Sequence, residues 1–261
     1  MRDILKEISE YKYKEIEKAK KKINPDDMEK AAKAANSPKA FLQNLRQYAP
    51  HAIIAEIKHK SPSKGILRKA FSPAKIAKSY KAAGAACLSI LTDNPSFGGE
   101  PHHLIDAKKA SGLPVLCKDF ILDPYQIAQA RSWGADCILL ILAMMDEAQA
   151  KDLFSYSREW GMDILVEVHN EEELERALIL QPDLLGINNR NLHNFETTLT
   201  TTLSLAKQIA EREDIFLISE SGISTKEDIA LLQKSGVRGF LIGEHFMRTE
   251  DPGKALEALL R

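Results

Sequence analysis

Cysteine is scarce in this sequence, with Cys87, Cys117 and Cys137 the only examples among 261 residues. A small secreted scaffold held together by disulfides would carry more cysteines, in an even number. Each of the three lies inside an apolar run of strand length, where a thiol packs as a small hydrophobic group. We therefore expect reduced thiols in the core of a cytoplasmic protein.

Long hydrophobic runs and targeting segments are also missing. The longest apolar run, Cys137 to Met145, lies between Asp136 and Asp146 and is far shorter than the roughly 20 residues that a membrane span needs. The amino-terminal segment lacks the apolar centre of a secretory signal, and its acidic side chains argue against a transit peptide. The chain ends at Arg261, soon after the last strand-like run, so we expect no further fused domain.

Neither sign of charge dominates. Lys and Arg number 36 against 37 Asp and Glu, which gives a net charge of -1. A balanced chain has no global reason to bind nucleic acid or an anionic membrane. Any anion must be bound by a local group of residues, so the expected partner is a small molecule.

Signatures of cofactor and metal sites are absent as well. The sequence contains no G-x-G-x-x-G turn of a dinucleotide site. His102 and His103 are adjacent, so their side chains diverge on a helix. The other histidines show no spacing typical of metal ligands: His51, His59, His169, His193 and His245. We expect neither a metal nor an organic cofactor.

The sequence does contain a repeated unit from residue 51 onward. Apolar runs without polar alternation are typical of strands buried on both faces, and here they alternate with helix-like segments. The runs are Ile53–Ile57, Ala86–Leu91, Pro114–Lys118, Cys137–Ile141, Ile164–Val168, Leu184–Asn188, Ile215–Ser219 and Gly239–Ile242. Eight such units without a linker predict an α/β fold, a (β/α)8 TIM barrel that forms one structural domain over residues 51–261. The alternative is an open doubly wound sheet, which more often carries the missing glycine-rich turn.

Residues 1–50 are predicted to form an N-terminal helical extension. Apolar residues recur at helical spacing between Ile4 and Lys22 among lysines and glutamates, which predicts a surface helix. A second helix is expected to open at Pro25. A third is expected after Ser37, with Ser37 as its cap and Pro38 in its first turn.

The stretch from Ile53 to Gly65 carries the densest set of reactive groups. Glu56 and Lys58 stand two residues apart on a strand and therefore share a face. Turn-forming residues 61–65 then leave hydroxyls, amides and lysines in a flexible, basic loop. This set suits a small anionic substrate. The alternative is a solvated ion pair at a strand end, which is common and weak.

Polar groups follow most of the other expected strands at the same end. The set includes Lys118, Glu167, Asn188, Arg190, Glu220, Ser221, Gly222, Gly243 and Glu244. Because the carboxyl ends of barrel strands meet at one rim, these residues would converge. Lysines and glutamates at one mouth can act as acids and bases, since burial and mutual charge set each pKa. Alternatively, Lys118 reaches solvent from a strand end and Glu167 is only its structural partner.

Glycines follow the last two expected strands. Gly222 and Gly243 stand where barrels often bind phosphate through backbone amides. Ser224 also fits as the cap of a helix that begins at Thr225. Both readings are compatible because they involve neighbouring amides.

Several signatures, in order, resemble the indole-3-glycerol phosphate synthase family of tryptophan biosynthesis, from Ile53 to the end of the chain. They occupy residues 55–65, 89–93, 116–120, 166–168, 186–190 and 220–224. The resemblance implies a carboxy-lyase that closes 1-(2-carboxyphenylamino)-1-deoxyribulose 5-phosphate to indole-3-glycerol phosphate, with loss of carbon dioxide and water. It also implies that the N-terminal extension helps to cover the active-site mouth. We expect a monomer.

The resemblance assigns catalytic roles to residues at the rim. Lys118, held near Glu56, would protonate the carbonyl oxygen during ring closure. Glu167 would be the base for the later loss of water, with Lys58 or Lys118 as the acid. Asn188 and Glu56 would orient the ribulose hydroxyls and the lysines.

The resemblance also assigns the residues that bind the substrate. Core packing is the alternative for the two phenylalanines among them. Lys58 and Arg190 are expected to contact the departing carboxylate, and Lys60, Gly222 and Gly243, with Ser221, the phosphate. The aromatic ring is expected to contact Pro62, Phe97, Phe120 and Leu139. Ser61 and Glu220 are also expected to bind the substrate.

Glu244 departs from the family pattern, which often has a small hydroxyl residue at this position. A carboxylate aimed at a phosphate would repel it. We therefore expect the backbone N–H of Glu244 to contact the phosphate while its side chain turns away.

Other functions remain as alternatives. A phosphosugar isomerase or epimerase of the same fold would rely on Cys and Asp or on paired Asp in the mouth loops, whereas the three cysteines lie within strands. A barrel that binds phosphorylated ligands without catalysis would be expected to lack Lys118 or Glu167, and both are present.

Overall fold

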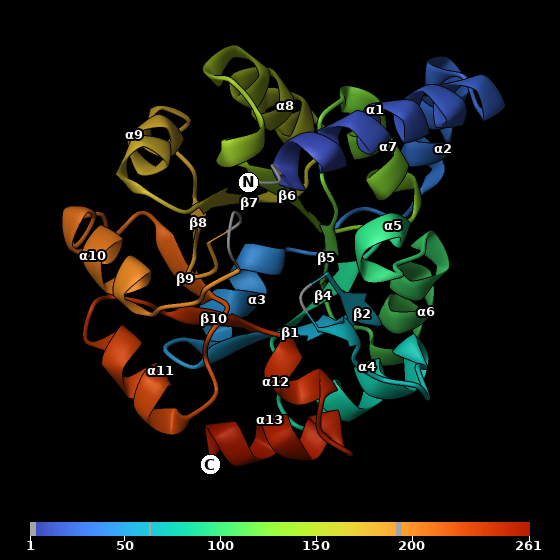
Figure 1. Cartoon of the computed structure of the whole chain (residues 1–261). Coiled ribbons are helices and arrows are strands. Elements are labelled where there is room, and N and C mark those ends of the chain that lie inside the picture. Colours follow the sequence, from blue (N-terminus) through green and yellow to red (C-terminus); the bar gives the residue numbers. More distant parts are fainter. Residues whose placement is uncertain (1–3, 63, 192–194) are drawn as a thin grey trace.

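In the computed structural model, which describes residues 4–62, 64–191 and 195–261, eight parallel strands of the described chain close a barrel (Figure 1). The strands are β1 (Ala52–Ile57), β4 (Cys87–Leu91), β5 (Val115–Lys118), β6 (Cys137–Ile141), β7 (Asp163–Val168), β8 (Leu184–Asn188), β9 (Phe216–Glu220) and β10 (Gly239–Ile242). Closure occurs where β1 pairs with both β10 and β4. The predicted (β/α)8 barrel is confirmed, with each strand boundary within one residue of its expected position. The open-sheet alternative is wrong.

Helices connect the strands and cover the outside of the barrel. They are α4 (Pro73–Ala82), α5 (Asn94–Phe97), α6 (Pro101–Ser111), α7 (Pro124–Ser132), α8 (Glu147–Glu159), α9 (Glu171–Ile179), α10 (Thr200–Gln208), α11 (Lys226–Gln233), α12 (Glu244–Met247) and α13 (Pro252–Leu260), with a 3₁₀ turn at Leu142–Met144. Thr225 caps α11, since its Oγ1 accepts a hydrogen bond from the Asp228 amide at 3.1 Å. The prediction that Ser224 caps this helix is therefore wrong by one residue.

Alternate residues of each strand serve two different cores. In β1, Ile53, Ala55 and Ile57 pack outward against the helices, whereas Ala52 and Ile54 pack into the barrel interior. The interior also holds Cys87 and Cys137, and Cys117 packs outward. All three cysteines are buried and free, as predicted. Burial raises the pKa of Cys117 to about 12, so this thiol stays protonated.

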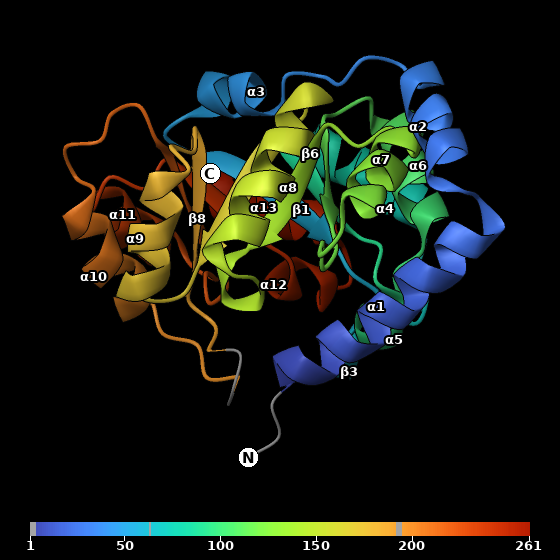
Figure 2. The ribbon, with the colours of Figure 1, turned by 90° about the horizontal axis from the view of Figure 1, so that it is seen from above.

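The N-terminal residues form α1 (Ile4–Lys22), α2 (Pro25–Ala34) and α3 (Phe41–Tyr48). Figure 2 shows α3 at one end of the barrel and α1 at the other. The α2 helix packs beside α7, where Met28 and Ala32 contact Tyr125 and Ala128. The extension therefore closes the amino end of the barrel with α3 and reaches the opposite rim with α1.

The start of α3 differs from its prediction. The helix begins at Phe41, its first turn has no side-chain cap from the preceding residue, and Ser37 lies outside it. The Leu42 amide instead donates to Asp163 Oδ2 at 2.9 Å. The Lys39 amide donates to Asp136 Oδ1 at 2.6 Å. Carboxylates of the barrel thus satisfy the free amides before and within the first turn, in place of a local cap.

The loop after β1 is more regular than expected. Lys60–Ser61 (β2) pairs in antiparallel fashion with Gly65–Ile66 (β3), and the Lys64 amide donates to Ser61 Oγ at 3.2 Å. Ser63 and His193 lie outside the described residues. Among the helices of the described chain, none combines the length and apolar character needed to cross a membrane.

Candidate active site

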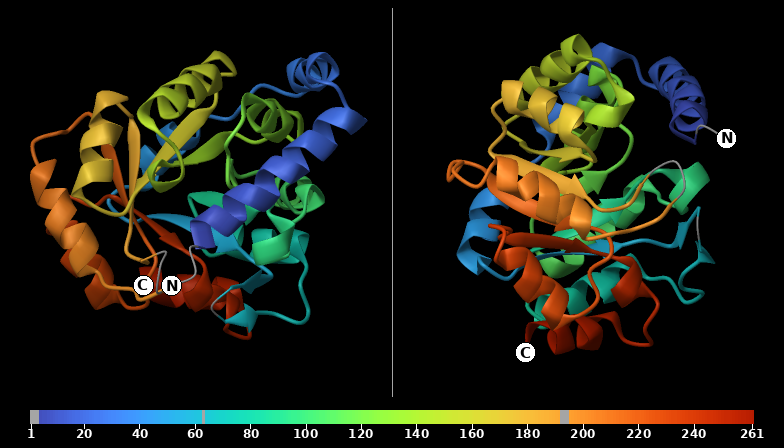
Figure 3. Two further views of the ribbon diagram at one scale, coloured as in Figure 1. Left: turned by 45° about the horizontal axis from the view of Figure 1, so that its top comes forward. Right: turned by 60° about the vertical axis from the view of Figure 1, so that its left-hand side comes forward.

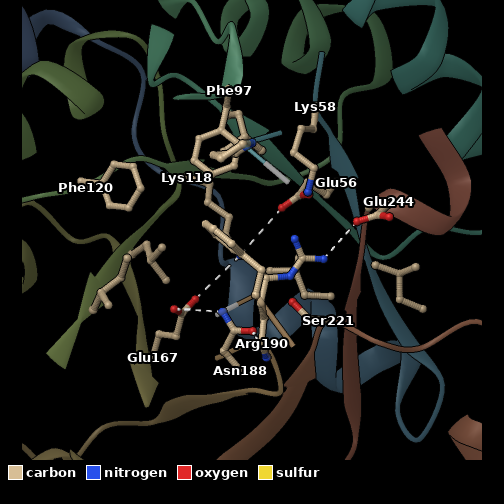
Figure 4. A pocket seen from close by; sticks show the side chains of 18 of the residues that line it. Glu56, Lys58, Phe97, Lys118, Phe120, Glu167, Asn188, Arg190, Ser221 and Glu244 are labelled. Carbon is tan, nitrogen blue, oxygen red and sulfur yellow. Dashed lines mark hydrogen bonds and ion pairs between the residues drawn. The ribbon is translucent and has the colours of Figure 1, made fainter. Parts of the chain in front are cut away.

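The carboxyl ends of the strands open into one pocket beneath α1, which crosses this rim of the barrel (Figure 3). Figure 4 shows Glu56, Lys118 and Glu167 facing the same space. The predicted convergence of polar residues at one rim is confirmed. Most of the residues expected at the site line the pocket, namely Glu56, Lys58, Pro62, Phe97, Lys118, Phe120, Leu139, Glu167, Asn188, Arg190, Ser221, Gly222, Gly243 and Glu244.

Lys118 lies among three buried carboxylates. Its Nζ is 2.6 Å from Glu220 Oε2, 3.8 Å from Glu56 Oε2 and 3.9 Å from Glu167 Oε2. Burial disfavours the ammonium, but the attraction of Glu220, Glu56 and Glu167 more than offsets it and raises the pKa of Lys118. Lys118 is therefore a permanent cation at neutral pH. Its proximity to Glu56 was predicted, whereas its closer partner Glu220 was not.

Glu56 and Lys58 form a buried pair on the inner side of the rim. Lys58 Nζ donates to Glu56 Oε1, and the two residues are only 8% and 3% exposed. The shared face is thus confirmed, and the solvated ion pair is wrong. Burial opposes the ionisation of Glu56, but Lys58 and Lys118 outweigh it and lower its pKa. Gly243 leaves room for this carboxylate, because a Cβ there would collide with Glu56.

Glu167 is held by polar groups on one side of its carboxylate. Asn188 Nδ2 donates to Glu167 Oε1 at 3.2 Å, and His169 Nε2 lies 3.2 Å from the same oxygen. Burial opposes ionisation, but His169, Lys118 and Asn188 together lower the pKa of Glu167. The second oxygen, Oε2, is buried without a hydrogen-bond partner among the described residues. The ionised carboxylate therefore keeps one oxygen without a hydrogen bond from the described residues, 3.9 Å from Lys118 Nζ.

Glu220 has the opposite electrostatic character. It is fully buried below the pocket, and burial together with the nearby Glu167 charge raises its pKa despite the contact with Lys118. Gly186 of β8 makes space for it, since a Cβ at that position would overlap Glu220 Oε1. Glu167 and Glu220 are thus two neighbouring carboxyls whose pKa values are shifted apart.

Arg190 and Glu244 form an ion pair on the other side of the pocket. Arg190 Nη2 donates to Glu244 Oε2 at 3.0 Å, and Arg248 Nη1 lies 3.6 Å from Glu244 Oε1. Both Arg190 and Glu244 line the pocket. The Glu244 side chain turns to the guanidinium of Arg190, which neutralises the carboxylate at the mouth of the pocket, and the expected contact of the Glu244 backbone N–H with phosphate stays a prediction. Burial opposes this ionisation, but Arg190 lowers the pKa of Glu244.

The opposite side of the pocket is apolar. The rings of Phe97 and Phe120 lie 6.0 Å apart between centroids, inclined by 30°, and Leu139 lies nearby in the pocket wall. Figure 4 shows both rings on the side of the pocket away from Glu244. The pocket therefore has an aromatic end and a polar end, separated by Lys118 and Glu167.

Three expected residues lie outside the described lining. Lys60 runs along the backbone at Gly98, where an added Cβ would lie 3.4 Å from Lys60 Cγ and Cε. Ser61 is buried and accepts the hydrogen bond from the Lys64 amide. Glu220 lies below the pocket and contacts it through Lys118. The prediction that places Lys60 beside Gly222 and Gly243 receives no support from this arrangement.

Sequence reasoning missed the way α1 joins the pocket. Ile4, Leu5 and Ile8 line it, and Lys12 anchors the helix with Nζ 2.7 Å from Asp93 Oδ1 and 2.8 Å from Asp119 Oδ1. Lys12 is one of many lysines in this segment, so the sequence does not distinguish it from the solvent-exposed ones. Asp93 and Asp119, which follow two strands, were the signal that could have identified partners for α1. The expected cover over the mouth is present.

His169 was also missed as a neighbour of Glu167. Its place two residues after Glu167, at the end of β7, offered a signal because alternate residues of an extended chain share a side. The spacing of metal ligands gives no sign of this contact, since the ring nitrogens lie beside the carboxylates of Glu167 and Glu173.

Comparison with known proteins gives relatives over the whole chain. The indole-3-glycerol phosphate synthase family profile matches residues 5–259. An indole-3-glycerol phosphate synthase of Rhodospirillum rubrum is 47% identical over 264 residues, covering 100% of each chain. Another, from an Acidovorax species, is 46% identical over 266 residues and covers 99% of each chain.

Solved structures share the fold at much lower identity. KGPDC from Streptococcus mutans has a TM-score of 0.60 at 13% identity, with 80% of this chain and 95% of that chain covered. Thiamine phosphate pyrophosphorylase from Pyrococcus furiosus has a TM-score of 0.57 at 18% identity, with 83% and 96% covered. These likenesses concern the barrel alone. The full-length sequence matches go further, and on them this chain belongs to the indole-3-glycerol phosphate synthase family.

Proposed function

We propose that this chain is an indole-3-glycerol phosphate synthase of tryptophan biosynthesis. It is a carboxy-lyase that converts 1-(2-carboxyphenylamino)-1-deoxyribulose 5-phosphate to indole-3-glycerol phosphate, carbon dioxide and water. The observation that carries the proposal is the Lys118 ammonium, whose side chain is only 16% exposed, within 3.9 Å of Glu56, Glu167 and Glu220 and beside the slot of Phe97 and Phe120. A cation between acids at the edge of an aromatic slot suits ring closure onto a carbonyl.

Ring closure forms a bond between the ring carbon that bears the carboxylate and the ribulose carbonyl carbon. Negative charge then builds on the carbonyl oxygen, which must take a proton. Lys118 is the proposed acid, because its position among carboxylates keeps the ammonium charged although its side chain is mostly buried. Glu56 and Glu220 fix the direction of the ammonium through their contacts.

Decarboxylation then returns the electrons of the carbon–carboxylate bond to the ring system. The carboxylate must be bound without being stabilised so strongly that its loss is impeded. We assign Lys58 and Arg190 to this contact. Each already shares its charge with a carboxylate, Lys58 with Glu56 and Arg190 with Glu244, so each offers moderate attraction.

Loss of water completes the indole. A base removes a proton from the intermediate while an acid protonates the departing hydroxyl. Glu167 is the proposed base, since Asn188 and His169 hold its Oε1 and its Oε2 lacks a hydrogen-bond partner among the described residues. Lys58 or Lys118 supplies the proton to the hydroxyl.

The phosphate is proposed to lie at the polar end of the pocket. Ser221 and Gly222 have positive φ values of 66° and 79°, and turns of this kind present backbone N–H groups to anions. Gly243 and the backbone of Glu244 line the same side. The proposed phosphate site lies across the pocket from the aromatic slot, an arrangement that suits an elongated substrate.

We further propose that the enzyme is cytoplasmic and monomeric and acts on this small phosphorylated molecule without nucleic acid or membrane. Its balanced charge and its buried free thiols support these expectations. The reaction requires proton transfers and loss of a carboxylate, so the proposal includes neither a metal nor an organic cofactor.

The test is to mix the protein with the anilino-ribulose phosphate and follow the rise of indole absorbance and fluorescence. We expect turnover, with release of carbon dioxide equal to the indole formed. Folded protein that yields no indole would refute the proposal. Conversion of simple phosphosugars instead would favour an isomerase or epimerase of the same fold.

A further inference from the structure

A histidine lies behind Glu167, on the side away from the substrate pocket. His169 Nε2 is 3.2 Å from Glu167 Oε1, and His169 Nδ1 is 3.0 Å from Glu173 Oε2. The imidazole side chain is 11% exposed. Of the described residues, His169 lines a neighbouring recess and not the substrate pocket itself. It therefore contacts the proposed base without a position for direct contact with the substrate.

Glu173 is held rigidly for its contact with the imidazole. It lies in the first turn of α9 and is 8% exposed. Its Oε2 accepts the His169 amide at 2.8 Å, and its Oε1 accepts from Asn170 Nδ2 at 2.7 Å. The Glu173 amide in turn donates to Asn170 Oδ1 at 2.9 Å. This carboxylate thus fixes both the orientation and the charge of the ring.

A carboxylate beside each ring nitrogen favours the doubly protonated imidazolium, because Nδ1 hydrogen-bonds to Glu173 Oε2 and the positive ring lies 3.2 Å from the Glu167 carboxylate. Burial disfavours the charged ring, but Glu167 and Glu173 more than offset it and raise the pKa of His169 to about 10. Arg190 and Glu196 also line the recess, with charges of opposite sign. Lys118 faces Glu167 from the other side, 3.9 Å away.

Glu167 needs this additional charge. A carboxyl buried to 2% exposure would otherwise take up a proton and lose its ability to act as a base. Lys118 alone does not balance the charge of the Glu167 carboxylate, since its ammonium is closer to Glu220 and also contacts Glu56. The imidazolium lies 3.2 Å from Glu167 Oε1, closer than the 3.9 Å between Lys118 Nζ and Glu167 Oε2.

We propose that His169 is a positioning residue for this reaction, a permanent imidazolium that keeps Glu167 ionised and oriented while Glu173 anchors the ring. The inference rests on the proposed role of Glu167 as the base. Glu173 and His169 thus form a chain of contacts behind Glu167, and they affect the reaction only through Glu167.

The first test needs no turnover. Protein labelled with ¹⁵N in histidine is titrated by NMR without substrate between pH 6 and pH 9. We expect the His169 ring nitrogens to keep the signals of a protonated imidazolium across this range. A ring that becomes neutral near the ordinary histidine pKa, about 6.5, would overturn the inference and leave the proposed function untouched.

The second test is kinetic and uses His169→Gln. Without the cation, the pKa of Glu167 should rise, so the acid limb of the kcat profile should move to higher pH. At pH values below the raised pKa of Glu167, we expect kcat to fall by about tenfold for each unit by which that pKa rises. The loss should be smaller at pH 8.5, and KM should stay within about twofold because His169 does not line the substrate pocket.

Two further variants separate this effect from a structural one. Glu173→Gln removes the anchoring charge but keeps the ring, so it should shift the acid limb in the same direction by a smaller amount. The exposed His51→Gln, at the other end of the barrel, should leave the profile unchanged. An acid limb that stays in place in both His169→Gln and Glu173→Gln would overturn the inference. If His169→Gln does not fold, Glu173→Gln and the NMR titration still decide it.

Discussion

Lys118 Nζ lies 2.6 Å from Glu220 Oε2, closer than the 3.8 Å that separates it from Glu56. The closest charge partner of the proposed acid is thus Glu220, a carboxyl below the pocket on β9, and not Glu56 on β1. Because that carboxylate raises the pKa of Lys118, it determines the pH at which the ammonium would lose its proton.

Glu220→Gln should lower the basic limit of activity. The amide keeps the size of the side chain but removes its charge, so the pKa of Lys118 should fall and the basic limb of kcat should move to lower pH. Burial raises the pKa of Glu220, so the loss should grow as pH rises and the wild-type carboxyl ionises. The pH profile of kcat measures this, with the exposed Glu213→Gln as control. A basic limb that does not move would contradict the electrostatic role.

Lys118→Ala should abolish turnover. It removes the acid for the carbonyl oxygen and leaves Glu56, Glu167 and Glu220 buried without their shared cation. General acid catalysis alone contributes on the order of 10²–10⁴-fold, and charge stabilisation adds to it. Steady-state indole formation measures the loss, and Lys109→Ala on the exposed face of α6 is the matched control. Activity within tenfold of wild type would mean that another group protonates the carbonyl.

Glu167→Gln should cut kcat severely, by roughly 10²–10³-fold, because an amide cannot accept the proton that leaves during dehydration. Binding should change little, since the side chain keeps its size and its contact with Asn188. Single-turnover experiments should show decarboxylation ahead of indole formation. Glu172→Gln, exposed on α9, is the control. Equal rates in the two variants would remove Glu167 from the role of base.

The barrel could be predicted from the sequence because its signal is repeated. Runs such as Cys137–Ile141 and Leu184–Asn188 are apolar at every position or nearly so. This pattern is typical of strands that are covered on both faces. The rim position of Glu56 and Glu167 followed from the same pattern, since parallel strands end at one rim. These predictions depended on local sequence and on topology.

Partner choice could not be predicted in the same way. The contact of Lys118 with Glu220 joins residues 102 positions apart, and the contact of Arg190 with Glu244 joins residues 54 apart. Such pairs depend on side-chain depth and direction, which periodicity does not give. The predicted start of α3 was wrong for the same reason, because the Leu42 amide in its first turn donates to Asp163, which is distant in sequence.

Glu244→Ser should have little effect on kcat and should strengthen phosphate binding. The change removes a carboxylate from the polar end of the pocket and releases Arg190 from its 3.0 Å contact, so the local potential becomes more positive. We expect the inhibition constant of inorganic phosphate to fall by about tenfold or less. Competition assays measure it, with Glu250→Ser as the exposed control. A large loss of kcat would show that the Arg190–Glu244 pair has a catalytic function.

Lys12→Met should release α1 from the mouth of the pocket. The Lys12 side chain is 5% exposed, and its Nζ lies 2.7 Å from Asp93 Oδ1 and 2.8 Å from Asp119 Oδ1, so its loss leaves the buried Asp93 and the partly buried Asp119 without this shared cation. Breaking a buried ion pair typically destabilises by about 3–5 kcal/mol. Because Ile4, Leu5 and Ile8 would then leave the pocket wall, KM should rise and protease should cleave within α1 more rapidly.

The matched control for this prediction is Lys14→Met, two residues along the same helix and exposed to solvent. It makes the same change in charge and length without affecting the contacts of Asp93 and Asp119. Thermal unfolding, limited proteolysis and substrate titration should distinguish the two variants. If Lys12→Met and Lys14→Met gave the same KM and the same cleavage rate, the ion pair would not be what holds α1 over the pocket, and the apolar contacts of Ile4, Leu5 and Ile8 would have to suffice.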